Sequence, residues 1–161
     1  MFKFCKILAL SLLVLTSACS DEKKSEPTSN TNEVSIVEPQ SGDIRATYKI
    51  DVADTQEKLY HGLMGRTSID ENYGLLFDLS IAPKDADIGF WMKDTLIPLD
   101  FVFFDDEGKV FHVYKDAQPN DLTTIRAPKR PRAVLEINAG QIDKFGIQIG
   151  DELKADLLSD K

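Results

Sequence analysis

The stretch from residue 44 to residue 52 reads Ile-Arg-Ala-Thr-Tyr-Lys-Ile-Asp-Val, with an apolar residue at every second position. Side chains that follow one another along a β-strand point to opposite faces of the sheet. This alternation therefore predicts a strand with one face in a core and the other in water. The stretch favours a fold built on a half-buried sheet.

A helix is predicted to follow this strand, over about residues 55–64. Asp54 can be the N-cap of a capping box in which Glu57 reaches back, and Gly65 can end the helix in a left-handed conformation. Gly62 costs about 1 kcal/mol relative to Ala inside a helix. Its presence there indicates a close approach of another segment.

Further strands are predicted along the rest of the chain, at residues 73–79, 88–93, 99–104, 109–114, 133–137 and 152–158. A turn containing Gly108 joins the third and fourth of these strands into a hairpin. A short second helix is predicted at about residues 141–145 and stops at Gly146. The predicted fold class is α+β and β-rich: a compact, curved or barrel-like, mostly antiparallel sheet with one main helix.

The N-terminus is typical of an exported lipoprotein. Lys3 and Lys6 precede an apolar run at residues 7–16, which is too short to span a membrane. Cys19 follows two small residues, so residues 1–18 are predicted to be a lipoprotein signal peptide. The cysteine would then carry the lipid, including palmitate-type acyl chains. The alternative is an ordinary signal peptide cut at the same place, with the cysteine incidental.

The lipid would place the protein in a bacterial cell envelope, with the membrane as its partner. Ser20, in place of an aspartate, permits transport to the periplasmic face of the outer membrane if the cell is Gram-negative. Residues 19–42 are rich in Ser, Thr, Asn, Glu and Pro, a composition that predicts a disordered tether. A single globular domain is then expected over residues 43–161.

Cysteine content and charge exclude several classes of function. Cys5 and Cys19 are the two cysteines, so the mature domain has no thiol nucleophile and no thiolate metal site. The formal net charge of −8 becomes −10 once Lys3 and Lys6 leave with the signal peptide. Such an acidic domain repels nucleic acid, which is not expected as a partner.

Residues 90–101 place charged and polar side chains among large apolar ones. The stretch holds the only tryptophan, Trp91, and the polar residues Lys93, Asp94, Thr95 and Asp100. Burying an unpaired charge costs several kcal/mol, by rough transfer values. These residues therefore either pair with one another at a strand end or line a site.

Several separated motifs occur in a known order. They are residues 61–66 (His-Gly-Leu-Met-Gly-Arg), 74–77 (Gly-Leu-Leu-Phe), 90–95 (Phe-Trp-Met-Lys-Asp-Thr), 97–100 (Ile-Pro-Leu-Asp) and 134–140 (Val-Leu-Glu-Ile-Asn-Ala-Gly), with Gly150-Asp151 behind them. Together they resemble the bacterial and archaeal family called domain of unknown function 192, over roughly residues 44–158. The resemblance implies a compact β-rich domain that is often exported and has no established reaction.

Three positions depart from the residues usual in that family. Asp94 stands where an asparagine is typical, Leu75 where a methionine is common and His61 where an arginine is frequent. At position 94 a carboxylate replaces a neutral amide. This change argues against a site that depends on an amide donor there.

One interpretation of the polar residues is a ligand-binding pocket roofed by Trp91. Its ligand-binding residues would be Arg66, Trp91, Lys93, Asp94, Thr95 and Asp100. Arg66 or Lys93 would hold an anionic or hydroxyl-rich ligand. The alternative is a buried ion-pair network that fixes the turn around Pro98, in which removal of one member would cost about 3–5 kcal/mol.

Glu136 lies in an apolar strand and faces away from Leu135 and Ile137 by alternation. With Asp100 it offers the paired carboxylates that acid–base or glycoside chemistry needs, and His61 could assist. The alternatives are an ion pair between Glu136 and Arg66 or a lysine, and an exposed histidine.

No metal site and no cofactor are predicted. A soft-metal site made by Met64, Met92 and His61 is conceivable, but methionines in such runs usually fill cores. The four cations Arg126, Lys129, Arg130 and Arg132 could meet lipid phosphates or an acidic polymer, or form a solvated loop.

Two functions follow from these observations. The first is an envelope-anchored domain that binds a small molecule, a glycan or a protein at the Trp91/Asp100 face. The second is a hydrolase-type enzyme that uses Asp100 and Glu136, with His61 as a third candidate. An enzyme needs these groups to converge on an open cavity, whereas a binding domain does not.

Overall fold

The computed structural model describes residues 32–155. The predicted signal peptide, Cys19 and most of the predicted tether lie outside these residues, as do residues 156–161. The described chain forms, in order, β1 (Glu33–Val37), β2 (Ile44–Ala53), α1 (Gln56–His61), β3 (Tyr73–Asp78), the 3-10 turn η1 (Leu79–Ile81), β4 (Leu99–Phe104), β5 (Val110–Ala117), β6 (Ala133–Asn138), α2 (Gln141–Phe145) and β7 (Glu152–Lys154).

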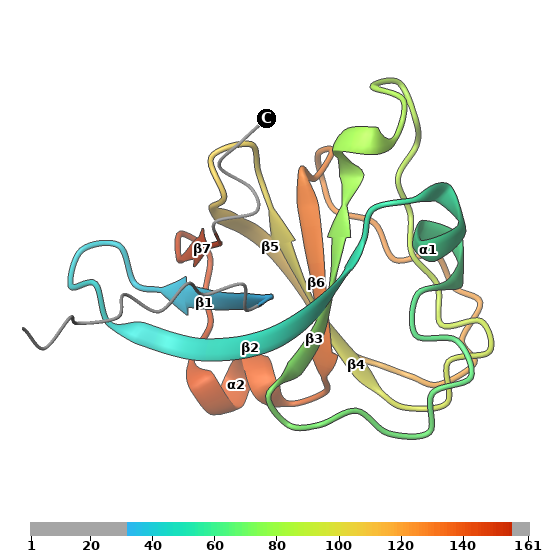
Figure 1. The fold of residues 1–161 in the computed structure, drawn as a ribbon, viewed down its shortest axis with the longest axis horizontal. Helices are drawn as coiled ribbons and strands as arrows, with labels where there is room; N and C mark the ends of the chain where they lie inside the picture. The colour runs from blue at the N-terminus through green and yellow to red at the C-terminus, as the bar shows by residue number, and fades with distance from the viewer. Residues whose placement is uncertain (1–31, 156–161) are drawn as a thin grey trace, which may run out of the picture.

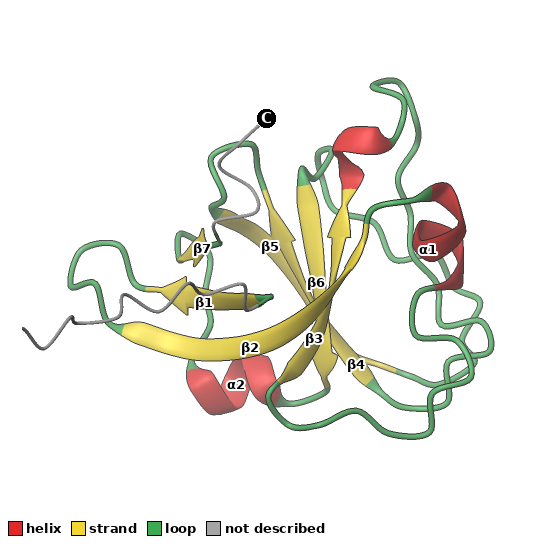
Figure 2. Cartoon of the chain, in the orientation of Figure 1, coloured by secondary structure: helices red, strands yellow, loops and turns green. Residues whose placement is uncertain are grey.

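The described strands form one mixed sheet in the order β5-β4-β6-β3-β2-β1-β7. Only the β2–β3 pair is parallel, because the chain crosses over through α1 between these two strands. Figures 1 and 2 show the sheet curling strongly, with α1 to one side and α2 below. The predicted β-rich fold with a curved sheet and two short helices is confirmed.

The curled sheet forms a half-barrel whose two edge strands meet at one end. The Leu153 amide donates to the Gly108 carbonyl at 2.8 Å, and the Val110 amide donates to the Asp151 carbonyl at 2.8 Å. These bonds connect β7 with the start of β5. The exposed edges that would invite pairing with another chain are therefore shortened.

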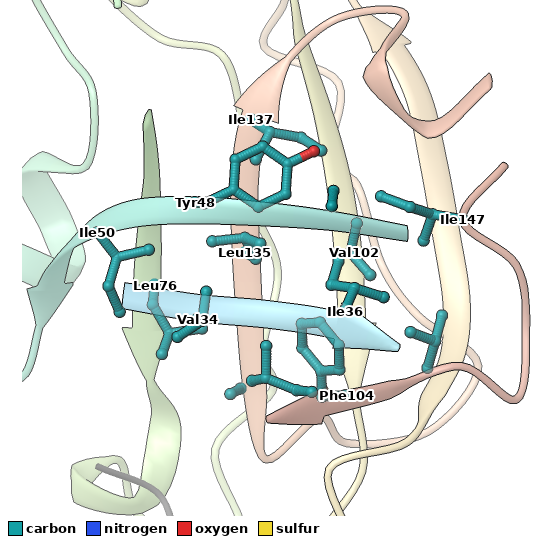
Figure 3. Packing of buried hydrophobic residues seen from close by; sticks show 14 of the residues in the cluster. Val34, Ile36, Tyr48, Ile50, Leu76, Val102, Phe104, Leu135, Ile137 and Ile147 are labelled. Carbon is teal, nitrogen blue, oxygen red and sulfur yellow. The ribbon is translucent and has the colours of Figure 1, made fainter. Parts of the chain in front are cut away.

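The concave side of the half-barrel holds the first of two cores. Figure 3 shows Val34, Ile36, Tyr48, Leu135 and Phe104 packing together from several strands. Ile142 of α2 belongs to the same cluster and is 1 % exposed, so the short helix closes one end of the core. Alternation along β2 explains the arrangement, since its inward residues all join this cluster.

A second core covers the convex face of β3, β4 and β6. Its members include Leu63, Phe77, Met92, Phe101 and Val134. The ring of Phe90 contacts three of the phenylalanines edge to face, with ring centroids 5.2 to 6.0 Å apart. Loops and α1 supply the outer layer, so this core holds the connections against the sheet.

The predicted tether was wrong in its last part. Residues 33–37 form β1, which pairs with both β2 and β7. Val34 and Ile36 are 1 % and 0 % exposed and lie in the first core. Two buried apolar residues in alternation stabilise this strand despite the polar residues around them. A strand that is hydrogen-bonded to a neighbour on both sides needs few apolar side chains to stay in the sheet.

The main helix is shorter than predicted. The Oγ1 of Thr55, and not Asp54, caps it by accepting from the Lys58 amide at 3.2 Å. The helix ends at His61 because Gly62 takes a positive φ of 50°. A methyl group on Gly62 would lie 3.3 Å from Phe77 Cζ, so the predicted close approach at this glycine is confirmed.

The strand predicted at residues 88–93 does not form. Only an isolated bridge between Phe90 and Ile125 occurs there. Asp94 has a φ of 53°, which breaks the extended backbone. The apolar residues of this stretch pack down onto the convex face of the sheet. The last strand, predicted to reach residue 158, is β7, and residues 156–158 lie outside the described part of the chain.

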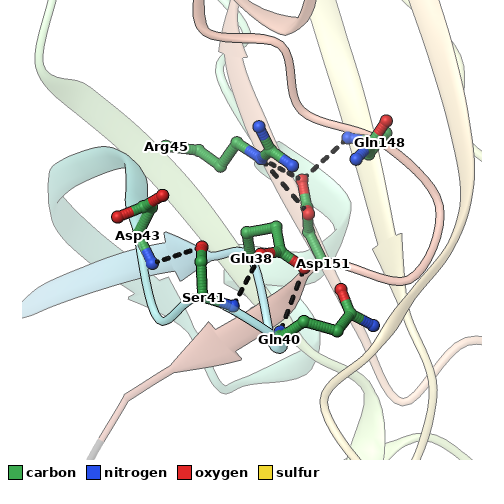
Figure 4. A network of polar contacts seen from close by, with 7 residues as sticks. All are labelled: Glu38, Gln40, Ser41, Asp43, Arg45, Gln148 and Asp151. Carbon is green, nitrogen blue, oxygen red and sulfur yellow. Dashed lines mark hydrogen bonds and ion pairs between the residues drawn. The ribbon is translucent and has the colours of Figure 1, made fainter.

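Asp151, from the last motif quoted above, serves the fold. Arg45 Nε donates to both carboxylate oxygens of Asp151, at 3.3 and 3.1 Å, and the backbone N–H of Gln148 donates to Oδ2 at 2.9 Å. Figure 4 shows these contacts beside the β1–β2 turn, where Glu38 accepts from the backbone. The carboxylate is 1 % exposed, so it connects β2 to the approach of β7 from within.

Candidate functional site

A cavity of about 310 Å³ lies between α1, the segment at residues 62–64 and the loop at residues 82–91. The convex side of the sheet forms its floor through Phe77 of β3 and Glu136 of β6. We call it the Trp91–Glu136 cavity. Such volumes are typical of small-molecule sites, which are mostly apolar with a few polar groups.

Trp91 stands at the rim of this cavity. It is 43 % exposed and meets the ring of Tyr60 from α1 edge to face, with the centroids 6.3 Å apart. The Nζ of Lys93 lies 5.9 Å from the indole centroid. Lys93, predicted as a ligand-binding residue beside Trp91, is thus close to the indole but does not line the cavity.

Glu136 supplies a buried carboxyl group at the floor. The residue is 5 % exposed, and within residues 32–155 its carboxyl makes no hydrogen bond or ion pair. Burial raises its pKa to about 8, because the charged form has lost its water without gaining a partner. The predicted ion pair with Arg66 or a lysine does not form.

The side chain of Glu136 points as the alternation predicted. Val134 lies in the second core, whereas Leu135 and Ile137 lie in the first. Gly62 leaves space for the carboxyl, since a methyl group there would come within 4.0 Å of Glu136 Oε2. The early end of α1 at this glycine therefore opens the floor of the cavity.

Asp100 lies on the other side of the sheet. Phe101, its neighbour in β4, is paired with Glu136, so Asp100 faces the concave core. Its oxygens accept from the amide of Asp116 at 2.9 Å and from the amide of Ile142 at 3.0 Å. The structure does not bring Asp100 together with Glu136, nor with Trp91.

The bond to Ile142 explains why Asp100 is buried. Gly140 is the N-cap of α2 and has no side chain to accept from the first turn. The carboxylate of Asp100 accepts a hydrogen bond from the Ile142 backbone N–H in that turn instead. Its negative charge also interacts favourably with the partial positive charge at the start of the helix. Asp100 therefore joins β4 to α2.

The other predicted ligand-binding residues separate into two groups. Thr95 is 4 % exposed and lines the cavity, and His61 is exposed and lies at its edge. Arg66 lies instead in a neighbouring polar groove of about 530 Å³ beside Tyr73. Asp94 is exposed, and its backbone carbonyl accepts from the Gly65 amide at 2.8 Å. An asparagine, usual in the family at position 94, also tolerates its positive φ.

The basic run at residues 126–132 is engaged within the protein. Arg126 pairs with Asp87 at 2.9 Å and Arg132 with Asp78 at 2.5 Å. Arg130 donates to the carbonyls of Leu79 and Ala82 at 3.1 Å, and Lys129 pairs with Asp105. These contacts hold the loop that forms one wall of the cavity.

Three aromatic residues of the cavity were not predicted as site residues: Tyr60, Phe77 and Phe90. Tyr60 carried a signal, since it is a large aromatic residue outside the apolar stripe of its helix. Phe77 and Phe90 carried no signal in the sequence. Their ring contact, with centroids 5.2 Å apart, joins a strand to a loop and depends on the tertiary structure.

A metal-binding cluster or a membrane-spanning helix would restrict the class of site. Among residues 32–155, no cluster of three or more His, Cys, Asp or Glu side chains could hold a metal ion. Met92 is 1 % exposed and belongs to the second core. None of the helices in the described part of the chain has the length and apolar composition to cross a bilayer.

Comparison with known proteins gives relatives without a known activity. Residues 36–155 match the profile of the family DUF192, described as an uncharacterized ACR family. A crystal structure of a protein of unknown function from Novosphingobium aromaticivorans is similar, with a TM-score of 0.68 and 31 % identity over 81 % of this chain and 90 % of that one.

A second crystal structure, from Sinorhizobium meliloti 1021, is of a protein provisionally described as a transcription regulator. Its TM-score is 0.68 and its identity 28 %, over 76 % of this chain and 91 % of that one. No functionally curated protein matches. The profile match covers most of the chain and the described motifs stand in the order that the resemblance required, so the chain belongs to the domain of unknown function 192 family.

Proposed function

We propose that this protein is a lipid-anchored component of a bacterial cell envelope that binds a small molecule in the Trp91–Glu136 cavity. One observation carries the binding role: the Glu136 carboxyl is 5 % exposed, has no partner within residues 32–155 and lines the cavity. Leaving a buried polar group unpaired costs about 1–3 kcal/mol. A ligand that pairs with it would recover that cost.

The form of the cavity supports a small molecule. Its rim is built from Trp91 and Tyr60, large side chains that offer contact area with little loss of freedom. Its wall is a loop tied down by Arg126 and Arg130. A rigid sheet carrying loops with binding residues is a common arrangement for a ligand site.

The anchor is proposed from the sequence alone. Cys19 behind its export run would carry the lipid, and the membrane would be the partner. The net charge of this chain is −8, and each cation of its basic run has an acidic or carbonyl partner within the protein. These charges do not favour contact with nucleic acid.

Binding can be measured directly, because Trp91 is the only tryptophan and its fluorescence reports on this rim. The purified full-length protein would be titrated with N-acetylglucosamine, 2-phenylethanol, 2-phenylethylamine and 3-phenylpropanoate. We expect a saturable change with at least one of them. Tyr60→Ala should weaken that binding by about tenfold through lost ring contact.

Tyr114→Ala is the matched control. Tyr114 is a half-exposed aromatic residue outside the cavity, 37 % exposed, so its loss should leave the affinity unchanged. A panel without any saturable response would overturn the proposal. So would a response that is equally sensitive to both substitutions.

A further inference from the structure

The charges around the Trp91–Glu136 cavity have one sign. Glu136 and Asp87 line it, and within residues 32–155 no lysine or arginine does. Asp87 is paired with Arg126 at 2.9 Å, which offsets its charge. Apart from His61, the Glu136 carboxyl is therefore the one lining group able to supply an uncompensated charge, and that charge is negative when the group ionises. An anionic ligand finds no lysine or arginine on the lining to pair with.

Aromatic rings form much of the remaining lining. Tyr60 and Trp91 stand at the rim in an edge-to-face pair, and Phe77 and Phe90 form a second such pair deeper in. The faces of such rings carry partial negative charge and attract cations. A carboxyl group and several aromatic rings around one space are complementary to a positively charged organic group.

A glycan fits this lining less well. Sugars are bound through many hydrogen bonds, and the groups here that can form them are few: the side chains of Gln56, His61, Thr95 and Glu136, the Tyr60 hydroxyl and the Trp91 indole N–H, besides the ion-paired Asp87. Thr95 already donates to the Lys93 carbonyl at 3.4 Å. The apolar and aromatic surface would leave most sugar hydroxyls without partners.

We infer that the ligand is an organic ammonium ion, an inference that rests on the proposed small-molecule function. Its charged group would pair with the Glu136 carboxylate, and its apolar part would contact the aromatic rings. Binding involves one proton transfer. Glu136 is protonated in the empty site at neutral pH, since burial raises its pKa to about 8. The ammonium enters with its charge, the carboxyl O–H gives its proton to water, and a carboxylate–ammonium pair remains.

Other titratable groups surround the same cavity as Glu136. Tyr60 and His61 lie on α1 and Asp87 on the loop at residues 82–91, and all three line the cavity. The phenol of Tyr73, at the start of β3, interacts electrostatically with Glu136 and also with Arg66. Lys93 lies outside, at the Trp91 ring. Histidine is the residue type that usually titrates near neutrality, so a substitution at position 61 is needed as a control.

The first test compares matched ligands through Trp91 fluorescence and titration calorimetry on the full-length protein. 2-Phenylethylamine should bind at least tenfold more tightly than 2-phenylethanol, and 3-phenylpropanoate should bind most weakly. Glu136→Gln should remove the preference for the amine and leave the affinity for the alcohol. Thermal unfolding of the variant confirms that it is folded.

The second test uses phenyltrimethylammonium, whose charge does not depend on pH. A carboxyl with a pKa of about 8 is about one-tenth ionised at pH 7 and nine-tenths ionised at pH 9. The affinity should therefore rise about tenfold over this range in the wild type and in His61→Gln, and stay level in Glu136→Gln.

The outcomes separate this inference from the proposed function. If the alcohol binds as tightly as the amine, or if Glu136→Gln keeps the preference, the cavity binds a ligand but the ammonium inference is wrong. If phenyltrimethylammonium binding does not strengthen with pH, the carboxylate does not meet the cation and the inference is also wrong. If no probe changes Trp91 fluorescence, both proposals fall.

Discussion

Glu136 places an ionisable carboxyl group at a buried position of β6 where an apolar side chain would be expected to pack. Its neighbours along β6 are apolar, and Phe101 of β4 lies directly across the strand pair. Burial without a partner holds the carboxyl in its neutral form up to a pKa of about 8. The folded state therefore binds a proton that the unfolded chain has lost, which makes stability depend on pH.

Glu136→Gln should flatten that dependence. Below about pH 4.5 the group is protonated in both states and has no effect; between about 4.5 and 8 only the folded state holds the proton. Wild-type stability should thus fall as pH rises, by the order of 4 kcal/mol at pH 8, and then level off. Urea denaturation at pH 5, 7 and 9 measures the difference.

Glu57→Gln supplies the control for this series. Glu57 is an exposed residue of α1, so the same chemical change should leave the wild-type slope intact. Parallel stability curves for the wild type and Glu136→Gln from pH 5 to pH 9 would contradict a buried, unpaired carboxyl.

Asp100→Asn should destabilise the fold and spare the cavity. The carboxylate accepts two backbone N–H bonds, and an amide presents one NH₂ that cannot accept. We expect a loss of about 1–3 kcal/mol in denaturation, with unchanged ligand response of Trp91. Asp94→Asn, at an exposed position with a φ of 53°, should change stability by less than about 0.5 kcal/mol.

A change in Trp91 response without loss of stability in Asp100→Asn would place Asp100 at the ligand after all. The ion-pair network that the sequence offered as an alternative would have given Asp100 a cation as its partner. The structure gives a different reason for instability, since backbone amides and no cation meet the carboxylate.

At the scale of elements, short strands and helices depend on contacts rather than on their own length. The helices α1 and α2 have six and five residues, fewer than an isolated helix needs for stability in water. Asp100 satisfies the start of α2, and Gly146 ends it at a φ of 64°. The five residues of β1 are held between β2 and β7.

Ile36→Ala tests the contribution of β1. Ile36 is fully buried in the first core, so its truncation should cost about 2–4 kcal/mol in chemical denaturation. Ile44→Ala is the matched control, because this isoleucine begins β2 and is 65 % exposed. Its cost should stay below about 0.5 kcal/mol. Equal effects of the two substitutions would mean that β1 does not pack as described.

At the scale of the whole molecule, the two cores have separate tasks. The concave core closes the half-barrel, and the convex core fixes the loops that surround the cavity. Arg132 and Asp78 connect these loops to β3. Burial would raise the pKa of Asp78, but its hydrogen bonds to Ser80 and Arg132 outweigh this effect and lower it to about 2.

The anchor is a prediction about the N-terminal residues, which lie outside the described part of the chain. Cys19 should carry a diacylglyceryl group after removal of residues 1–18, because it follows an export run and two small residues. Intact-mass and peptide mass spectrometry of protein isolated from cell membranes would show the added lipid. Cys19→Ser should abolish it and release the protein from the membrane fraction. An unmodified Cys19 in the mature protein would exclude this anchor.

Local patterns determined most of the elements. Alternation predicted β2 and the direction of the Glu136 side chain, and the turn with Gly108, at a φ of 76°, predicted the β4–β5 hairpin. These features depend on residues close in sequence, whose side-chain direction follows from the period of the strand. The strand predicted at residues 88–93 was wrong because a local pattern cannot distinguish a strand from a loop that packs on a sheet, which also carries large apolar side chains.

Only the tertiary structure decided which predicted residues share a site. Alternation within β4 cannot tell whether Asp100 lies on the same face as Glu136. That answer comes from the register of two strands far apart in sequence, in which Phe101 is opposite Glu136. The cavity likewise joins a helix end, a loop and two strands, and its chemistry depends on a carboxyl left without a partner. Such a property belongs to the packed whole, because desolvation and the absence of a counter-charge are set by every segment around Glu136.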